Sequence, residues 1–398
     1  MIVGMANARS RAPHSPVHRI RPRASRSIVR VLGLLLLGFF LTAGSAVTVM
    51  YANLQGNLTQ HELEEYVPEE ERPTQAPPED GSRGKPLNIL VIGSDVRDGD
   101  ADIDGAGAAG EVVGMRSDTT MIVHISANRR RADVVSIPRD TLVEIPSCRL
   151  PDGSRTPHEY SGMFNKAFEL GGQTGDVGAA AACTIRTVEE LTGIYIDGFV
   201  VVDFASFQDV VNTLGGVDIC LAEPVEDAAA GLQLDEGCQT LNGEQALGLA
   251  RARKSLGDGS DLGRIDRQQQ LVEAIMAKAL SLDVVSNLPA LYGIIEDLSE
   301  NVETSTSLGD ITQLGGLAYS LRNLDLENLT MITMPWEPAG PRVTPAPKAD
   351  DVWEALINDR PLPELDPQTS GGSPIIEGSE AEVEQFRDAV GGGVLLED

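Results

Sequence analysis

Two aspartates stand at positions where the sequence pattern predicts the ends of strands. Asp95 and Arg97 follow the apolar run 87–93, and Asp118 opens the apolar run 119–126. Ligands of open α/β sheets bind at the carboxyl ends of strands, so Asp95 and Arg97 are placed for function. Two carboxylates on neighbouring strand ends could hold one Mg²⁺ (or Mn²⁺), which prefers oxygen ligands. An ordinary Asp-containing turn is the alternative, and the pattern alone leaves it open.

A second group of polar residues is basic and lies where the pattern predicts a core. Arg139 closes an apolar strand, Arg251 ends an apolar helical stripe, and Arg253 follows two residues later. Arg264 and Gln268 open the apolar face of another predicted helix. Burying an unpaired guanidinium is costly, so these groups need an anionic partner. The structural alternative is pairing with nearby acids, namely Asp258, Asp261 and Asp266. Several arginines converging in an acidic chain favour a bound polyanion instead.

The charge of the chain argues against nucleic acid as a partner. The 398 residues carry 60 acidic and 31 basic side chains, a net charge of -29, although residues 1–30 hold seven arginines and no acid. A phosphate backbone needs a broad basic face, which the acidic remainder does not offer. Any phosphate site in this remainder must therefore be a local cluster of arginines.

Residues 31–53 contain no charged residue and are mostly apolar. About 20 such residues cross a bilayer as a helix, and the arginines of residues 1–30 favour the cytoplasmic side. We therefore expect one transmembrane helix in the cell membrane, a cytoplasmic N-terminus and an extracytoplasmic body. A signal peptide cleaved near residues 43–46 is the alternative. The apolar run continues past that point, which favours a retained helix.

Composition divides the rest of the chain into three parts. Residues 54–86 are acidic and rich in proline, which predicts an unstructured linker. The globular catalytic domain is expected over residues 87–335. Residues 336–398 are rich in Pro, Gly and acids, which predicts a largely disordered tail.

Short apolar runs alternate with helical spacing inside the body. Strands are expected at 87–93, 119–126, 132–138, 197–204 and 329–335. Helices are expected at 160–171, 176–192, 205–214, 243–252, 264–282, 286–299 and 307–320. Asn242 and Gln245 resemble a capping box that opens one of these helices. Hairpins mixed with strand–helix–strand units predict the α/β class, with a mixed central sheet covered by helices.

All four cysteines follow the apolar segment, and an even count in an exported body predicts two disulfides. Three pairings are possible. The sequential pairing closes the shortest loops and is the one we predict, with bridges Cys148–Cys183 and Cys220–Cys238.

Taken in order, these segments resemble the LytR–CpsA–Psr family over about residues 87–335. The matching segments are NILVIGSDVR, RSDTTMIV, VVSIPRDTLVEIP, NKAFELGG, GFVVVDFASFQDVVNTLGGVD, LNGEQALGLARARK and RIDRQQQ. The resemblance implies Mg²⁺ held by Asp95 and Asp118, which with Arg139 would be the catalytic residues. It implies that a pyrophosphate is gripped by Arg97, Arg139, Lys166, Arg251, Arg253, Arg264 and Gln268. One departure from the family is the long Gly-, Ala- and Asp-rich stretch 98–115, between Asp95 and Arg116.

The resemblance also implies an activity. A polyprenyl pyrophosphate lipid would bind between sheet and helices, and its glycopolymer would pass, as a sugar phosphate, to a peptidoglycan hydroxyl. Arginines and a metal suit this phosphotransferase chemistry because they neutralise the pyrophosphate leaving group. Two alternatives stay open, a polyprenyl-pyrophosphate-binding regulator of the envelope without ligase activity and a pyrophosphatase. The sequence does not predict which polymer is transferred.

Overall fold

The computed structural model forms two compact units, residues 1–52 and 53–398, and each is described by itself. The described residues are 24–74, 84–94, 115–221, 223–228, 230–252, 261–281, 296, 302–310, 316–317, 320–321, 324 and 328–365. Asp95, Arg97 and Arg253 therefore lie outside them.

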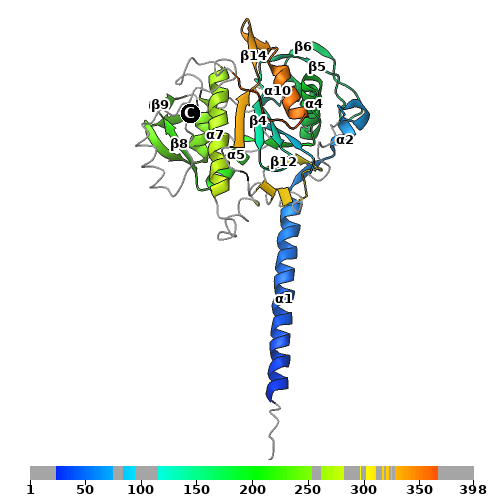
Figure 1. Ribbon diagram of the computed structural model, residues 1–398, viewed down its shortest axis with the longest axis vertical. Coiled ribbons are helices and arrows are strands. Elements are labelled where there is room, and N and C mark those ends of the chain that lie inside the picture. The colour runs from blue at the N-terminus through cyan, green and yellow to red at the C-terminus, as the bar shows by residue number, and fades with distance from the viewer. Residues whose placement is uncertain are drawn as a thin grey trace, which may run out of the picture. The chain divides into compact units, whose positions relative to one another are not determined.

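Helix α1 (Ala24–Asn57) makes up the described part of the first unit (Figure 1). It exposes large apolar side chains such as Leu34, Phe39 and Phe40. Within the described part of the chain, however, no helix combines the length and the apolar character needed to cross a membrane. The transmembrane helix predicted at 31–53 is therefore not confirmed.

A seven-stranded sheet forms the centre of the second unit. Its order is β1 (Thr59–His61), β12 (Val302–Ser305), β7 (Gly198–Val202), β2 (Leu87–Ser94), β3 (Ser117–Ile125), β4 (Ala132–Ser136) and β13 (Leu329–Thr333). Strands β2, β3 and β4 are antiparallel neighbours, whereas β7 pairs with β2 and β13 with β4 in parallel. The mixed sheet predicted from the sequence is confirmed, and so is the hairpin of β3 and β4.

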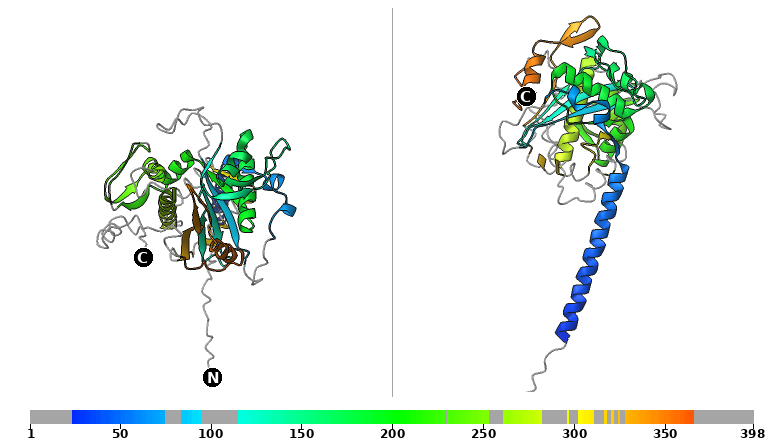
Figure 2. Two further views of the ribbon diagram at one scale, coloured as in Figure 1. Left: turned by 90° about the horizontal axis from the view of Figure 1, so that it is seen from above. Right: turned by 90° about the vertical axis from the view of Figure 1, so that its right-hand side faces the viewer.

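Helices cover this sheet on both sides, which explains why its strands are near-continuous apolar runs. Figures 1 and 2 show α4 (Val177–Thr192) on one side and α5 (Phe204–Thr213) and α7 (Asp261–Ser281) on the other. Leu90 and Ile122 of the sheet share a buried core with α4, while Ile89 and Ile125 belong to a cluster on the opposite face.

Side-chain caps fix where the helices begin. Asp176 accepts the backbone N–H of Ala179 at 2.7 Å, and helix α4 starts there. Helix α6 (Gly243–Arg251) begins at the capping box that Asn242 and Gln245 form, as the sequence predicted. Such caps satisfy N–H groups that have no partner inside the helix. They set the starting point from which the later side chains of each helix are counted.

A second core lies beside the sheet. Its side chains come from α5, α6 and α7 and from two hairpins, β8 (Val217–Leu221) with β11 (Gly237–Leu241) and β9 (Val225–Asp227) with β10 (Leu232–Leu234). Leu271 of α7 is 1% exposed in it. This core holds α7 in place beside the sheet.

Both predicted disulfides are present. Cys148 and Cys183 join the segment after β5 (Leu142–Ile145) to helix α4, with Cα atoms 5.3 Å apart. Cys220 and Cys238 lie directly opposite each other in β8 and β11, with Cα atoms 3.8 Å apart, closer than the usual 4.4–6.8 Å. No cysteine of the chain is left free.

The linker predicted at 54–86 is wrong over its first half. Strand β1, helix α2 (Leu63–Tyr66) and a 3₁₀ turn, η1 (Glu69–Glu71), lie within it. Tyr66 and Val67 are buried, and Arg72 bonds Glu189 of α4 at 2.6 Å. A few apolar anchors and ion pairs with distant residues order this acidic segment.

The disordered tail predicted at 336–398 is wrong over residues 336–365. Strands β14 (Trp336–Ala339) and β15 (Arg342–Pro345) form a hairpin, and helix α10 (Ala349–Ile357) packs Trp353 into the core beside α4. The amphipathic spacing of this helix outweighs the polar composition around it. Residues 366–398 lie outside the described residues.

One helix prediction is wrong. The helix expected at 160–171 is replaced by β6 (Glu159–Met163), which pairs with β5, and by the short helix α3 (Lys166–Gly171). Strand β6 is stabilised by pairing with β5, and the spacing of apolar residues within 160–171 does not reveal that partner. The helices expected at 286–299 and 307–320 lie mostly outside the described residues.

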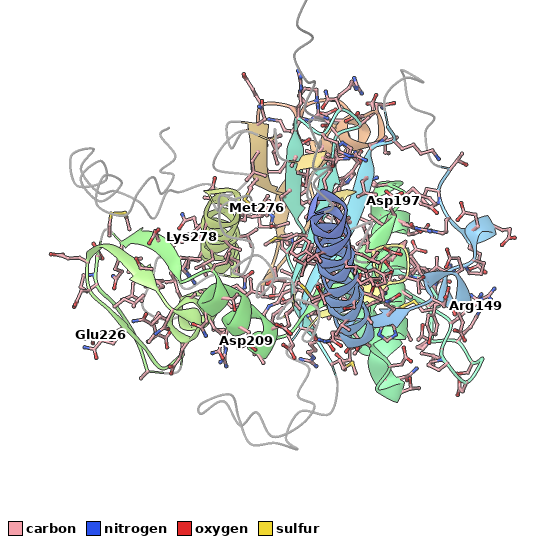
Figure 3. The ribbon with its side chains drawn as sticks, turned by 90° about the horizontal axis from the view of Figure 1, so that it is seen from below. Arg149, Asp197, Asp209, Glu226, Met276 and Lys278 are labelled. Carbon is pink, nitrogen blue, oxygen red and sulfur yellow. A yellow bond between two sulfur atoms is a disulfide. The ribbon has the colours of Figure 1, made fainter. Side chains whose placement is uncertain are left out.

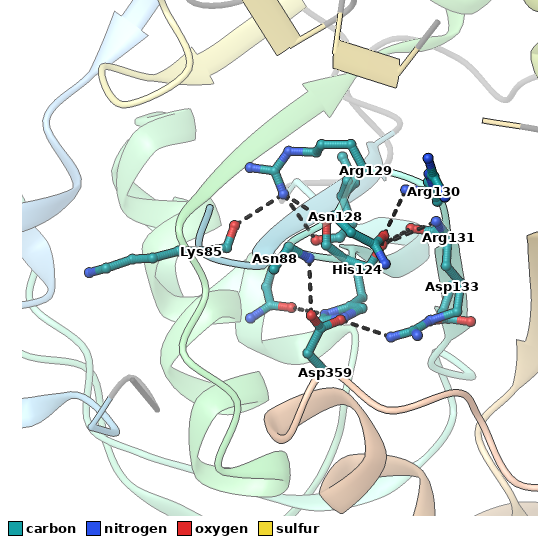
Figure 4. Close-up of polar contacts among 12 residues, drawn as sticks. Lys85, Asn88, His124, Asn128, Arg129, Arg130, Arg131, Asp133 and Asp359 are labelled. Carbon is teal, nitrogen blue, oxygen red and sulfur yellow. Dashed lines mark hydrogen bonds and ion pairs between the residues drawn. The ribbon is translucent and has the colours of Figure 1, made fainter. Parts of the chain in front are cut away.

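A polar network connects the end of α10 with the sheet at one end of strands β2, β3 and β4 (Figure 4). The His124 ring lies between Asn88 Oδ1 at 2.7 Å and Asp359 Oδ1 at 3.1 Å. Arg131 donates to Asp359 at 2.8 Å and to the buried carboxylate of Asp133 at 2.8 Å. Asp359 therefore connects the C-terminal helix with β3 and β4 through charged hydrogen bonds.

Replacing Asp359 by Ala should loosen α10. The carboxylate bonds His124, Arg131 and, at 3.0 Å, the backbone N–H of Ala127. We expect the free energy of unfolding to fall by about 2–3 kcal/mol and amide exchange in α10 to accelerate. Glu354→Ala is the control, because it removes an exposed pair with Arg360 and should cost less than about 1 kcal/mol. Equal losses in both variants would contradict the role of Asp359.

Acid should remove the same stabilisation. Burial alone would raise the pKa of Asp359, but hydrogen bonds from His124 and Ala127 and the charge of Arg131 outweigh it, so its pKa is lowered. A carboxyl with a lowered folded-state pKa stabilises the fold above its unfolded-state value of about 3.9, and the effect is lost as pH falls through the folded-state value. The difference in stability between the wild type and Asp359→Ala should therefore shrink as the pH is lowered below about 4.

Candidate functional site

Asp118 lies at a β-bulge at the start of β3. Strand β2 pairs Gly93 with Thr119 and then Ser94 with Ser117, so the register passes over Asp118. A bulge of this kind bends the strand and redirects the side chain of the extra residue. The carboxylate predicted as a metal ligand thus stands at a local irregularity of the sheet rather than in a regular pair.

Arg139 lies just beyond β4 and faces Asp118. Its Nη1 donates to Asp118 Oδ1 at 2.5 Å, and its Nε lies 3.9 Å from Asp140 Oδ1. The side chains of Arg139 and Asp118 are 19% and 29% exposed. The backbone carbonyl of Arg139 accepts the N–H of Asn165, which holds the turn after β4. The two residues form a half-buried ion pair that solvent and ligands can reach.

Gln268 of α7 reaches the same strand end. Its Oε1 accepts the hydroxyl of Thr119 at 2.7 Å, and its Nε2 donates to the carbonyl of Ala250 at 3.4 Å. Since Thr119 follows Asp118 and Ala250 precedes Arg251, Gln268 connects the carboxylate strand with the end of helix α6. The side chain predicted to contact pyrophosphate is therefore fixed beside the ion pair.

Arg251 is the last residue of α6. Its guanidinium carbon lies 5.1 Å from the centre of the Phe204 ring, at the start of α5. A guanidinium at this distance from an aromatic ring gains a cation–π attraction that restrains its orientation. Arg251 is half-buried, so it is held by α5 and still accessible.

Two residues of this site were not predicted from the sequence. Arg267 is 2% exposed and donates to the carbonyl of Ala252 at 2.6 Å, next to Arg251. Gln269 donates to the hydroxyls of Ser136 in β4 and Thr333 in β13 at 3.0 and 3.2 Å. The sequence did contain a signal for Arg267, because it lies three residues after Arg264 and so shares its helical face.

The remaining predicted residues are not all brought together. Lys166 lies at the start of α3 and pairs with Glu159. Arg264 lies in α7, but its side chain is outside the described part, as are those of Asp261 and Asp266. Asp95, Arg97, Arg253 and Asp258 also lie outside the described residues. The structure therefore brings together Asp118, Arg139, Gln268 and the end of α6.

Of the two carboxylates predicted to hold a metal, the described residues include Asp118. They contain no group of three or more His, Cys, Asp or Glu side chains that could hold a metal. Mg²⁺ typically needs only one or two carboxylates, with waters and substrate phosphate completing its shell. Asp118 is partly exposed at the strand end, which suits one such carboxylate. Asp95 would be the second, and it lies outside the described residues.

Known proteins of one family are similar to this chain in sequence. The LytR_cpsA_psr family model matches residues 47–354. The polyisoprenyl-teichoic acid–peptidoglycan teichoic acid transferase TagT of Bacillus subtilis strain 168 is 32% identical over 261 residues, which cover 64% of this chain and 70% of TagT. A second polyisoprenyl-teichoic acid–peptidoglycan teichoic acid transferase, TagU of Oceanobacillus iheyensis, is 30% identical over 285 residues, which cover 72% of this chain and 75% of TagU.

A solved structure shares the fold. The crystal structure of B. subtilis TagV aligns with a TM-score of 0.50 and 27% identity, over 70% of this chain and 99% of TagV. The mixed sheet with helices on both sides is thus the architecture of this group of proteins.

The bond between Thr119 and Gln268 should couple the strand to α7. Thr119→Val keeps the shape and removes the donor, and Gln268→Leu removes the acceptor. In a double-mutant cycle on unfolding free energies we expect a coupling of about 1 kcal/mol. Thr330→Val, at an exposed position of β13, should show no coupling with Gln268→Leu. A Thr119–Gln268 coupling no larger than this control would contradict the contact.

Proposed function

The chain belongs to the LytR_cpsA_psr family, and we propose that it moves a glycopolymer from a polyprenyl pyrophosphate carrier to peptidoglycan. The two relatives compared above are named as teichoic acid transferases that act between a polyisoprenyl-linked polymer and peptidoglycan, which supports this class of enzyme. The observation that carries the proposal is the Asp118–Arg139 ion pair at the strand ends, with Gln268 beside it.

The proposed step is a direct displacement at phosphorus. A peptidoglycan hydroxyl attacks the phosphorus that bears the sugar, and the bond from this phosphorus to the bridging oxygen breaks. The sugar phosphate of the polymer becomes bonded to the peptidoglycan oxygen, and polyprenyl phosphate is the leaving group, which keeps the bridging oxygen. The proton of the hydroxyl passes to a carboxylate, for which Asp118 is the described candidate.

Arginines stabilise the charge that develops on the leaving group. Asp118 pairs with Arg139 and the Phe204 ring contacts Arg251, and these restraints support the proposed role of both arginines. A guanidinium can bond two phosphate oxygens at once, which a lysine ammonium cannot do in the same planar geometry. We propose that the same pyrophosphate is contacted by Arg97, Lys166, Arg253, Arg264 and Gln268.

We propose that Asp118, with Asp95, holds the Mg²⁺ or Mn²⁺ of the reaction. When bound, the ion would neutralise charge on the phosphate oxygens. Asp118 would then serve the metal and Arg139 together, since its carboxylate has two oxygens.

We further propose that the body works outside the cytoplasm. The two disulfides support this, because such bonds persist in oxidising compartments. The single-pass membrane anchor and an apolar lipid pocket lined by the helices after residue 264 remain predictions of the sequence.

Asp118→Asn should lower polymer transfer at least 100-fold, because the variant cannot accept a proton and loses its charge beside Arg139. The measurement is the amount of polymer attached to peptidoglycan from a lipid-linked donor, with and without a chelator. Glu144→Gln, an exposed acid of β5, is the control and should keep wild-type activity. Full activity of Asp118→Asn, or activity unaffected by chelation, would contradict the assigned roles of Asp118 or of the metal.

Arg251→Lys keeps the charge and loses the planar fork, so transfer should fall at least tenfold rather than slightly. Donor binding should weaken as well, since the pyrophosphate is contacted before the reaction. Arg130→Lys, at an exposed turn, should change neither property. Release of free sugar phosphate without acceptor would identify a pyrophosphatase, and donor binding without either product would identify a carrier-binding protein.

A further inference from the structure

Three arginines surround one carboxylate on a part of the molecule that the proposed reaction does not use. Glu71 accepts hydrogen bonds from Arg149 at 3.2 Å, from Arg155 at 3.1 Å and from Arg186. The hydrogen bond from Arg186 lowers the pKa of Glu71 to about 2 against the effect of burial, and Arg149 and Arg155 add to it. A single guanidinium suffices to pair a carboxylate, so this cluster carries more positive charge than Glu71 requires.

A β-bridge, a disulfide and helix α4 restrain the backbone around the three arginines. Arg149 and Arg155 lie directly opposite each other across an isolated β-bridge. The Cys148–Cys183 disulfide fastens the residue before Arg149 to helix α4. Arg186 follows Cys183 by about one turn on the same helix. The backbone positions of the three arginines are therefore set before any ligand arrives, which lowers the entropic cost of binding.

A pocket of about 320 Å³ opens beside Arg149 and Arg155. Its walls include Arg149 and Arg155, whose side chains are 41% and 42% exposed. Tyr66 lines the pocket as well, as do Glu65, Leu150, Pro151 and Gly153. Each guanidinium has five N–H donors, so Arg149 and Arg155 can keep Glu71 and still bond an acceptor in the pocket.

The lining indicates what kind of anion fits. Glu71 shows that the cluster accepts a carboxylate. Glu65 in the same wall would repel a polymer with a phosphate in every repeat, but it can pair with an ammonium group. Leu150 and Pro151 offer an apolar wall for short side chains. A peptide that carries carboxylate and ammonium groups matches this combination better than a polyphosphate does.

We propose that Arg149 and Arg155, with Arg186 pairing Glu71 behind them, form a second binding site, which takes a carboxylate of the peptides in the peptidoglycan acceptor. The inference rests on the proposed function, since that function makes peptidoglycan the acceptor. Figure 3 shows Arg149 on the opposite side of the molecule from Glu226 of β9 and Lys278 of α7. Arg149 is ten residues after Arg139, so the two lie at most about 36 Å apart. A polymeric acceptor can span this distance.

The test measures binding of soluble peptidoglycan fragments to the full-length chain by calorimetry, with no donor present. Arg149→Gln combined with Arg155→Gln should weaken binding at least tenfold. Arg130→Gln combined with Arg360→Gln removes the same charge at two exposed positions elsewhere and should leave binding unchanged. Thermal unfolding checks that both double variants remain folded.

Glu71→Gln provides an effect of opposite sign. Without the internal carboxylate, the three guanidiniums should bind the fragments more tightly, by at least threefold. The same glycan after enzymatic removal of its peptides should bind the wild type at least tenfold more weakly. In a transfer assay the double variant at 149 and 155 should raise KM for peptidoglycan and leave kcat unchanged.

Three results would overturn the proposal. These are equal binding of glycan with and without peptides, unchanged binding by the double variant at 149 and 155, and displacement of the fragments by poly(glycerol phosphate), which would identify a phosphate site. The proposed function fails independently. If the wild type binds the fragments through Arg149 and Arg155 but transfers no polymer, the site stands and the transferase assignment falls.

Discussion

The ion pair between Asp118 and Arg139 depends on the length and register of one hairpin. Strands β3 and β4 pair Met121 with Ser136, and Asp118 and Arg139 lie three residues outward from these on either side. Half-buried charges of opposite sign stabilise each other only at contact distance, and a lone one would be costly. A shift of one residue in this register would turn the side chains to the opposite face. The position of the candidate site thus follows from the pairing of two apolar strands.

The helical layer depends on the same strand ends. Consecutive residues of α7 reach in different directions: Arg267 bonds the end of α6, Gln268 bonds β3, and Gln269 bonds β4 and β13. Successive helical residues are about 100° apart, so a run of three long polar side chains can reach three neighbours. Leu271, one turn later, lies in the second core. That core therefore restrains α7, whose polar residues bond Thr119, Ala250 and Ala252, the chain neighbours of Asp118 and Arg251.

Much of this arrangement could be predicted from local patterns. Five of the seven strands of the sheet, the capping box of α6 and both disulfides depend on short-range spacing or loop length, whereas the short edge strand β1 and its neighbour β12 were not predicted. The pattern predicted Asp118 and Arg139 at strand ends, and the register of one hairpin brings them into contact. The errors at 54–86 and 336–398 have a different cause. Glu71 finds Arg186 115 residues away, and Asp359 finds His124 at a separation of 235. Composition shows the charges of such segments but not their distant partners.

The two arginine groups of the chain differ in how their charge is balanced. Arg139 faces Asp118 in an ion pair of one cation and one anion. Under the proposed function a substrate phosphate and a metal ion would bind there together, and their charges would offset each other. Arg149, Arg155 and Arg186 share Glu71, and Glu65 stands nearby in the wall of an open pocket. An anion can join this group without a metal. In a chain of net charge -29, positive sites confined in this way restrict anion binding to a few positions, because the general negative charge opposes non-specific binding of anions.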